Sequence, residues 1–331
     1  MKTRITFLIT LLMGFMSQAQ SIEKFSIDSG GATATAGGIE IMYTIGEVNV
    51  AERTSATVSL SEGFVTPSVK ININASVFLQ GPLLNPATPG LMNDILREDA
   101  YLPATSPYAD ALTVDPNVFN TGGTSGTGLA ADDIVDWVWV ELRSKDDNTK
   151  IVSSQSALLQ RDGDVVALDG LSDLTMIAAK NDYFVALKHR NHIGAMSLGT
   201  IALSEVAVSV DFKDSGFSAY GTDAQVILGS GNKALWAGNV NSDTTIQYAG
   251  AGSLDTSSLL AFILNDGTNF LNLATWPVTG YTNNDVDMNG ITQYAGAGVL
   301  DTPYILQNIL SYPGNFLNLS TWQIQEQLPE N

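Results

Sequence analysis

The feature that most constrains the fold is an internal duplication toward the end of the 331-residue chain. Residues 239–255 read NVNSDTTIQYAGAGSLD, and residues 285–301 read DVDMNGITQYAGAGVLD. The match continues through a helix-like run and ends with NFLNLATW in one copy and NFLNLSTW in the other. A match of this length, over 239–276 and 285–322, indicates a duplicated unit, so we expect the same small motif to be built twice.

Oxygen-bearing side chains occupy alternate positions at the start of each copy. In the second copy, positions 1, 3 and 5 are Asp285, Asp287 and Asn289. Ca²⁺ takes oxygen ligands from carboxylates, amides and carbonyls, and a curled loop can bring alternate side chains onto one ion. The carbonyl of Ile291, at position 7, would add a ligand. Asp301 is the first acid downstream; it opens the helix-like run and is expected to close the shell while capping the helix.

The first copy has the same pattern with fewer acids. Its expected ligands are Asn239, Asn241, Asp243, the carbonyl of Thr245, and Asp255. It offers two aspartates where the second copy offers three. We therefore expect two Ca²⁺ sites, of which the second binds more tightly. The alternative is a pair of turns without an ion, because Asn and Asp are common in turns.

This pattern resembles the calcium loop of dockerin modules. D-x-D-x-N-G, followed by an aspartate and a short helix, carries the resemblance, and dockerins also hold two copies of a loop and a helix. The resemblance covers residues 229–331 and implies calcium binding by the Asp and Asn side chains of both loops. The AGAG segment is an insertion relative to dockerin copies, and we interpret it as a bulge that returns the aspartate to the loop. Cohesin binding is not implied.

Residues 1–19 are predicted to be a secretory signal peptide. Lys2 and Arg4 precede an apolar run over residues 5–16, and the small residue Ala19 precedes the expected cut. The run is too short to span a bilayer, and no stretch of about 18 apolar residues follows, so no membrane span is expected. We therefore expect a secreted or cell-surface protein.

Charge and cysteine content exclude several classes of function. With 34 acidic and 15 basic residues the net charge is −19, which argues against nucleic-acid partners. The chain has no cysteine, so disulfides, thiolate nucleophiles and Cys-ligated zinc are excluded. A bound metal ion is another way to stabilise loop-rich segments, because binding adds to the free energy of folding.

The expected fold is mainly β, with β-sandwich domains followed by a small dockerin-like repeat of loops and helices. Residues 20–68 are predicted to be a small β module. Residues 69–228 are predicted to be a sandwich-like domain with a long insertion at 81–133, and 229–331 the duplicated module. DWVWVEL, at 136–142, is apolar on both faces, which indicates a central strand covered on each side.

The wider arrangement resembles modular surface proteins of the Bacteroidetes, which often carry haemagglutinin-like labels. Three stretches carry this resemblance: YTIGEVNV with LSEGF, then DWVWVELR with ALLQRDGDVVALDG and YFVALKHRNH, then LWAGNVNSD. It implies a location at the cell surface and no particular activity.

We expect a non-catalytic adhesion, scaffold or structural protein whose partner is a protein or glycan at the cell surface, with self-assembly left open. The alternative is a carbohydrate-binding module accessory to polysaccharide degradation. Trp137 and Trp139 share one strand face; exposed, they would stack on sugar rings, and buried, they would belong to the core.

An enzyme of the glycosidase type is the third hypothesis, and we do not expect it. Paired carboxylates carry out glycoside hydrolysis, but the pairs in this chain fall in predicted turns, where solvation explains them: Asp132/Asp133, Asp146/Asp147 and Asp162/Asp164. His189 and His192 are three apart, and residues three apart in a strand point to opposite faces. The two rings could share a ligand only around a turn.

Overall fold

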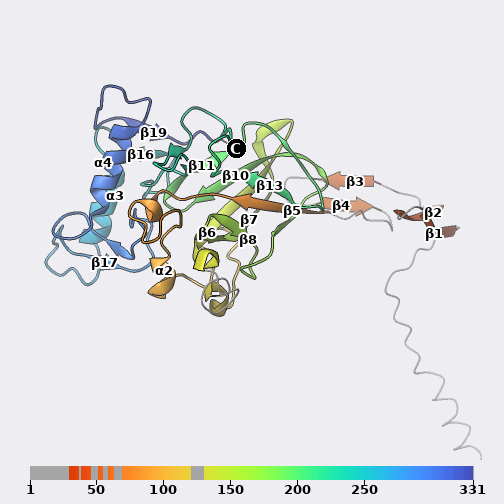
Figure 1. Cartoon of the computed structure of the whole chain (residues 1–331), viewed down its shortest axis with the longest axis horizontal. Coiled ribbons are helices and arrows are strands. Elements are labelled where there is room, and N and C mark those ends of the chain that lie inside the picture. Colours follow the sequence, from red (N-terminus) through yellow and green to blue (C-terminus); the bar gives the residue numbers. More distant parts are fainter. Residues whose placement is uncertain are drawn as a thin grey trace, which may run out of the picture. The chain divides into compact units, whose positions relative to one another are not determined.

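The computed structural model describes residues 69–120 and 130–330, and, of the first 68 residues, the backbone of four strands (Figure 1). The chain divides into two compact units, Met1–Ser68 and Val69–Asn331. The predicted signal peptide at 1–19 lies outside the described residues. No helix in the described part of the chain is long and apolar enough to cross a membrane.

Two antiparallel hairpins are described in the first unit. Strand β1 (Gly30–Ala36) pairs with β2 (Ile39–Ile45), and β3 (Ala51–Thr54) pairs with β4 (Ser59–Glu62). The glycine-rich stretch 28–38 has the composition of a turn or flexible link, but it supplies β1. Each residue of β1 lies opposite a residue of β2, and this ladder outweighs the local preference of glycine.

A nine-stranded sheet forms the centre of the second unit. Its path is β11-β10-β6-β7-β8-β5-β13, with β12 paired to β10 and β9 paired to β5. All pairs are antiparallel except β13 with β5. The mainly-β prediction is confirmed, and the antiparallel pairing is consistent with a sandwich. The strands are β5 (Lys70–Ser76), β6 (Ile134–Ser144), β7 (Asp147–Gln160), β8 (Asp164–Val166), β9 (Leu174–Ile177), β10 (Asn181–His189), β11 (His192–Met196), β12 (Ile201–Leu203) and β13 (Val208–Asp211).

Strand β6 runs through the core, as its two apolar faces predicted. Every residue of β6 is buried except Trp139 and Ser144, which are half-buried. Trp137 is fully buried, and its indole N–H donates to the carbonyl of Pro103 at 2.9 Å. The insertion at 81–133, in its described segment 81–120, packs onto this core rather than standing away from it, because this segment contributes buried side chains to the same apolar cluster. Its short elements are 3-10 helices at Gly81–Leu83, Pro116–Asn120 and Ala130–Asp132, and helix α2 (Ile95–Glu98).

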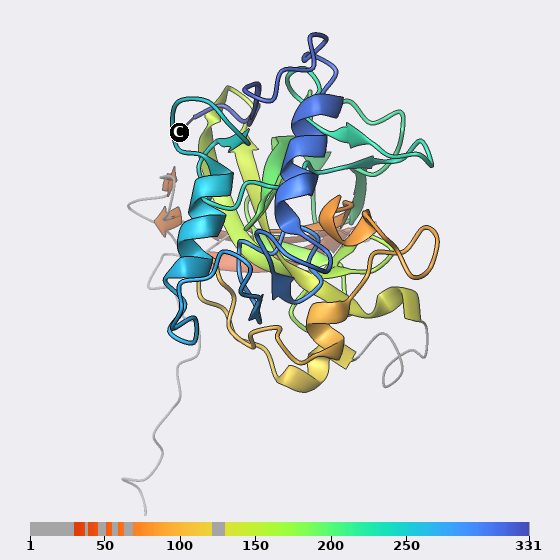
Figure 2. The same cartoon turned by 90° about the vertical axis from the view of Figure 1, so that its left-hand side faces the viewer.

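The repeat builds two loop–helix units that exchange strands. The short strand in each copy's loop pairs with the strand that follows the other copy's helix, at equivalent positions. Helices α3 and α4 lie side by side on one flank of the unit (Figure 2). The elements are β14 (Val226–Ile227) paired with β15 (Lys233–Ala234), β16 (Thr245–Gln247), α3 (Asp255–Leu264), β17 (Val278–Thr279), β18 (Ile291–Thr292), α4 (Asp301–Ser311) and β19 (Gln323–Gln325).

The repeat and the sheet belong to one compact unit, although the sequence suggested a boundary between residues 228 and 229. The repeat's apolar core includes Ile193, which lies in β11. Gln80 and Asn308 form a buried amide pair across the two parts, with Nε2–Oδ1 at 2.7 Å and Nδ2–Oε1 at 2.9 Å. Buried amides are nearly always hydrogen-bonded, so this pair holds α4 against the segment that follows β5.

Candidate metal centre

Asp301 is the first residue of α4 and closes the loop of the second copy. Its Oδ1 accepts from the backbone N–H of Val286 at 2.6 Å, and its Oδ2 accepts from that of Gln293 at 2.7 Å. Both carboxylate oxygens therefore tie the start of the helix to the two ends of the preceding loop. Asp255 does the same in the first copy, with Val240 at 2.8 Å and Gln247 at 2.7 Å.

The AGAG segment loops out between the loop and the helix. The side-chain amide of Gln293 donates to the carbonyls of Ala295 and Ala297 at 3.3 and 3.0 Å. Gly296 and Gly298 adopt φ of +113° and +121°, which is strained for any residue with a side chain. The segment is thus a compact bulge held by one glutamine, and Asp301 returns beyond it to face the loop.

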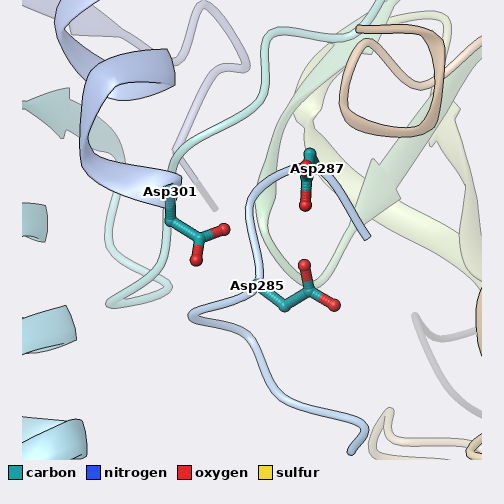
Figure 3. Close-up of side chains that lie close together, drawn as sticks. All are labelled: Asp285, Asp287 and Asp301. Carbon is teal, nitrogen blue, oxygen red and sulfur yellow. The ribbon is translucent and has the colours of Figure 1, made fainter. Parts of the chain in front are cut away.

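Three carboxylates gather at this place. Asp285, Asp287 and Asp301 each offer an oxygen, and these oxygens lie within 4.8 Å of one another. The carboxylates of Asp285 and Asp287 face each other, and that of Asp301 points toward the space beside them (Figure 3). Asp285 and Asp301 are almost fully buried, and Asp287 is half-buried. Such a cluster could hold a metal ion.

Burial and mutual repulsion make this cluster electrostatically costly when ionised. Burial, together with the charge of Asp285, raises the pKa of Asp287 to about 7. The same two causes raise the pKa of Asp301 well above its usual range, and burial raises that of Asp285 although Arg190 offsets part of the effect. Carboxylates this close cannot all ionise at neutral pH without a counter-charge. A divalent cation among them would supply it.

Asn289 and Ile291 lie at the edge of the cluster. The Asn289 amide nitrogen donates to Asp287 Oδ2 at 3.0 Å, and its Oδ1 accepts from the backbone N–H of Ile291 at 2.8 Å. Asp285 accepts from the backbone N–H groups of Asn289 and Gly290 at 3.1 and 2.8 Å. The loop is therefore already curled around Asp285. Of the five ligands expected in this copy, three meet in the cluster and Asn289 adjoins it.

The loop of the first copy closes on itself through amide donors. Asn239 Nδ2 donates to the carbonyl of Asp243 at 2.7 Å, and Asn241 Nδ2 donates to the Asp243 carboxylate at 2.9 Å. Asp243 also accepts from the N–H of Thr245 at 2.7 Å. Among the described residues the grouping of three acids occurs only in the second copy. Asn in place of Asp at positions 1 and 3 accounts for the difference.

A buried polar network, which the sequence did not reveal, lies beside the second loop. Asp136 Oδ1 accepts from the Tyr281 hydroxyl at 2.6 Å, and its Oδ2 accepts from Arg190 Nε at 3.0 Å and lies 3.2 Å from His189 Nε2. Burial alone would raise the pKa of Asp136, but the charge of Arg190 and the bonds from His189 and Tyr281 outweigh it and lower the pKa to about 2. Asp136, at the start of the otherwise largely apolar segment DWVWVEL, is the feature of the sequence that could have indicated this network.

His189 and His192 meet across the β10–β11 turn, with their Nδ1 atoms 3.0 Å apart. The backbone N–H of Gly81 donates to His192 Nε2 at 3.0 Å, so the proton of His192 is assigned to Nδ1 and that of His189 to Nε2, facing Asp136. Both rings are then neutral, in agreement with the lowered pKa that burial gives each of them.

The same turn holds the second loop in place. Asn191 Nδ2 donates to the carbonyl of Asp285 at 2.7 Å, and Arg190 Nη1 donates to the carbonyl of Thr282. Arg190 also lies 4.2 Å from the ring centroid of Tyr281. The network therefore positions the residues just before the carboxylate cluster on the edge of the sheet.

A scan of the chain against protein-family models gave no match, and searches of curated proteins and of solved structures gave none either. The resemblances to dockerin modules and to surface proteins of the Bacteroidetes remain hypotheses that rest on the residues themselves.

Proposed function

We propose that the second loop of the repeat binds Ca²⁺ through Asp285, Asp287 and Asp301. One observation carries this proposal: three carboxylates, two buried and one half-buried, converge within 4.8 Å. The donor set is all oxygen, which suits a hard cation, and a loop with flexible ligand positions suits Ca²⁺ better than the strict octahedron of Mg²⁺. The side chain of Asn289 and the carbonyl of Ile291 complete the proposed site.

The first copy is proposed to bind a second ion more weakly. Both loops have to exchange an amide–carboxylate bond for contacts with the ion: Asn241–Asp243 in the first and Asn289–Asp287 in the second. The first loop brings fewer charges to the site, because Asn occupies its positions 1 and 3. The proposed ligands are Asn239, Asn241, Asp243, Asp255 and the carbonyl of Thr245. Two loops of this kind on paired helices are what a dockerin-like module requires.

At the level of the whole protein, we propose an exported, non-catalytic adhesion or scaffold protein stiffened by calcium. The acidic balance and the lack of cysteine support a chain that uses ions rather than disulfides for stability. Solvation explains Asp146/Asp147, which are exposed at the β6–β7 turn, but not the other two acid pairs, since Asp133 is buried and Asp162 and Asp164 are half-buried. Asp133 lies 3.5 Å from Arg97 and Asp164 lies 3.3 Å from Lys213, so ion pairing explains these acids and we do not propose a glycosidase.

Thermal unfolding of the full chain with Ca²⁺ and with a chelator tests the cation site. An ion that binds only the folded state adds about 2.7 kcal/mol at a hundredfold excess over its Kd, which raises the midpoint by several degrees. The variant Asp287→Asn should lose most of this rise. Asp146→Asn, which removes an exposed acid at a turn, should keep it.

A midpoint that is the same with Ca²⁺ and with chelator would overturn the proposal. An equal rise of the midpoint with Mg²⁺ would support a cation site but contradict its assignment to Ca²⁺.

A further inference from the structure

A cleft of ≈ 490 Å³ opens where β6, the β10–β11 turn and the loop of the first repeat copy meet. Its size lies within the range of small-molecule sites, which is about 300–1,000 Å³. None of the three clustered carboxylates lines it. It is therefore separate from the proposed cation site of the second loop, but it adjoins that of the first loop, because Asn239 and Asp243 line it.

One wall of the cleft is aromatic and rigidly held. Trp139 and Tyr108 have ring centroids 5.6 Å apart and planes tilted by 37°. The Trp139 indole N–H donates to Glu141 Oε1 at 3.1 Å. Glu141 Oε2 in turn accepts from Arg143 Nε and Nη2 at 2.9 and 2.8 Å. A buried ion pair thus fixes the orientation of a half-buried tryptophan, and a ligand would not have to order it.

The rest of the lining presents polar groups whose charges largely cancel, and Lys188 is the cross-strand neighbour of Trp139. Lys188 faces Glu326 at 3.8 Å, and Arg190 is paired with Asp136. Two buried atoms of cleft-lining residues, Asn239 Oδ1 and Arg190 Nη2, have no hydrogen-bond partner among the described residues. Both side chains are more than nine-tenths buried. Arg190 Nη2 is therefore a donor left to be satisfied beside the cleft, and Asn239 Oδ1 is an acceptor that either a ligand in the cleft or an ion in the first loop would satisfy. Unpaired buried polar atoms are uncommon in folded proteins.

These features select a neutral ligand with an apolar face and several hydroxyls. An anion would approach Glu326 and Asp243, and a cation, although attracted by the Trp139 ring, would approach Lys188 and Arg190. A pyranose ring offers C–H groups on one face for the indole and hydroxyls around its edge. We propose that the cleft binds a neutral pyranoside, with one sugar ring against Trp139 and its hydroxyls facing Lys188 and Glu326.

This inference goes beyond the cation site of the second loop, none of whose three carboxylates lines the cleft. Trp137, the other tryptophan on the same strand face, is fully buried. The platform is therefore one tryptophan with Tyr108 and not a pair of tryptophans. Such a site suits the recognition of one or two sugar units at a cleft rather than an extended flat surface.

The test uses the full chain and two kinds of probe. An array of neutral glycans identifies candidate ligands. Affinity is measured by tryptophan fluorescence and calorimetry in titrations with methyl glucoside, methyl galactoside, methyl mannoside and N-acetylglucosamine. At least one pyranoside should bind. Trp139→Ala should weaken it at least about tenfold. Trp276→Ala, which removes a half-buried tryptophan outside the cleft, should leave affinity within about twofold.

Lys188→Ala serves if Trp139→Ala does not fold. Lys188 lies at the rim with a 36% exposed side chain, so its removal should lower affinity at least about threefold while the unfolding midpoint stays unchanged. The proposal is overturned if no neutral glycan binds, if a folded Trp139→Ala protein binds as well as the parent, or if choline binds in preference to every pyranoside. With chelator, the affinity for the pyranoside should stay within about twofold, which separates glycan binding from cation binding at the adjoining first loop.

Discussion

At the residue scale, Asp255 and Asp301 perform the same structural task in different electrostatic surroundings. Each accepts two backbone N–H groups and ties its helix to its loop. Burial raises the pKa of Asp255 to about 7. Asp301 has, in addition to burial, the charges of Asp285 and Asp287 beside it. A cation therefore relieves more electrostatic repulsion at Asp301 than at Asp255, and we expect the second site to bind it more tightly.

The two buried histidines predict a pH dependence of stability. Burial lowers the pKa of His189, and burial with the neighbouring positive groups lowers that of His192 well below its usual value. The folded state keeps the rings neutral, whereas the unfolded chain takes up protons near its ordinary pKa of about 6.5. Stability is therefore full above about pH 6.5 and falls below it, by at most about 1.4 kcal/mol per pH unit for each ring.

Urea unfolding at about pH 7.5 and about pH 5.5, with Ca²⁺ in excess so that the acid cluster stays ionised, measures this effect. We expect a lower midpoint at the acidic pH. His192→Gln should show a smaller difference between the two values, because one of the two rings no longer titrates. A midpoint that stays level or rises on acidification would contradict a neutral histidine pair.

At the scale of elements, each copy depends on a bulge that one glutamine holds. Gln247 and Gln293 occupy equivalent positions and donate to the carbonyls of their own AGAG segments. The bulge allows an aspartate that lies far along the chain to reach the loop. The two copies then exchange short strands, so neither loop is completed by its own copy alone.

Gln293→Ala is expected to loosen the second bulge and the position of Asp301. Loss of the two hydrogen bonds should cost about 1–3 kcal/mol, and Ca²⁺ affinity at the stronger site should fall about tenfold. Calorimetric titration measures the affinity. Gln247→Ala is the matched control: it removes the equivalent side chain in the first copy and should leave the stronger site unchanged. Equal effects of the two variants on that site would contradict the assignment.

At the scale of the whole molecule, the repeat is part of the same compact unit as the sheet. The buried pair Gln80–Asn308 joins α4 to the segment after β5. The contact from Asn191 to the carbonyl of Asp285 joins the β10–β11 turn to the second loop. An ion that orders the second loop is therefore expected to stabilise the sheet through these contacts.

We predict that residues 69–331 unfold in one cooperative transition and that Ca²⁺ protects the sheet as well as the repeat. Hydrogen exchange measured with Ca²⁺ and with chelator should show slower exchange in β10 and β11 as well as in the second loop. Protection confined to residues 285–301, or two separate transitions in calorimetry, would show that the repeat is independent.

Gln80→Ala leaves the Asn308 amide buried with fewer partners. The substitution should lower the free energy of unfolding by about 1–3 kcal/mol.

The sequence by itself determined the features that depend on short spacing. The alternating oxygens from Asp285 to Asn289 and the doubly apolar strand β6 are patterns within a few neighbouring residues, and the duplication is a direct match between two segments of the sequence. The mainly-β class follows from such patterns, and so does the expectation that the second loop is the more acidic one.

Only the tertiary structure decided which of these residues meet. Asn191 and Asp285 are 94 positions apart, and Asp136 and Tyr281 are 145 apart, so no local pattern predicts their contacts. Packing also separated Trp137, which is in the core, from Trp139, which is at the cleft, although both share one strand face. Burial depends on what covers a face, and the insertion and the repeat cover this face from distant parts of the chain.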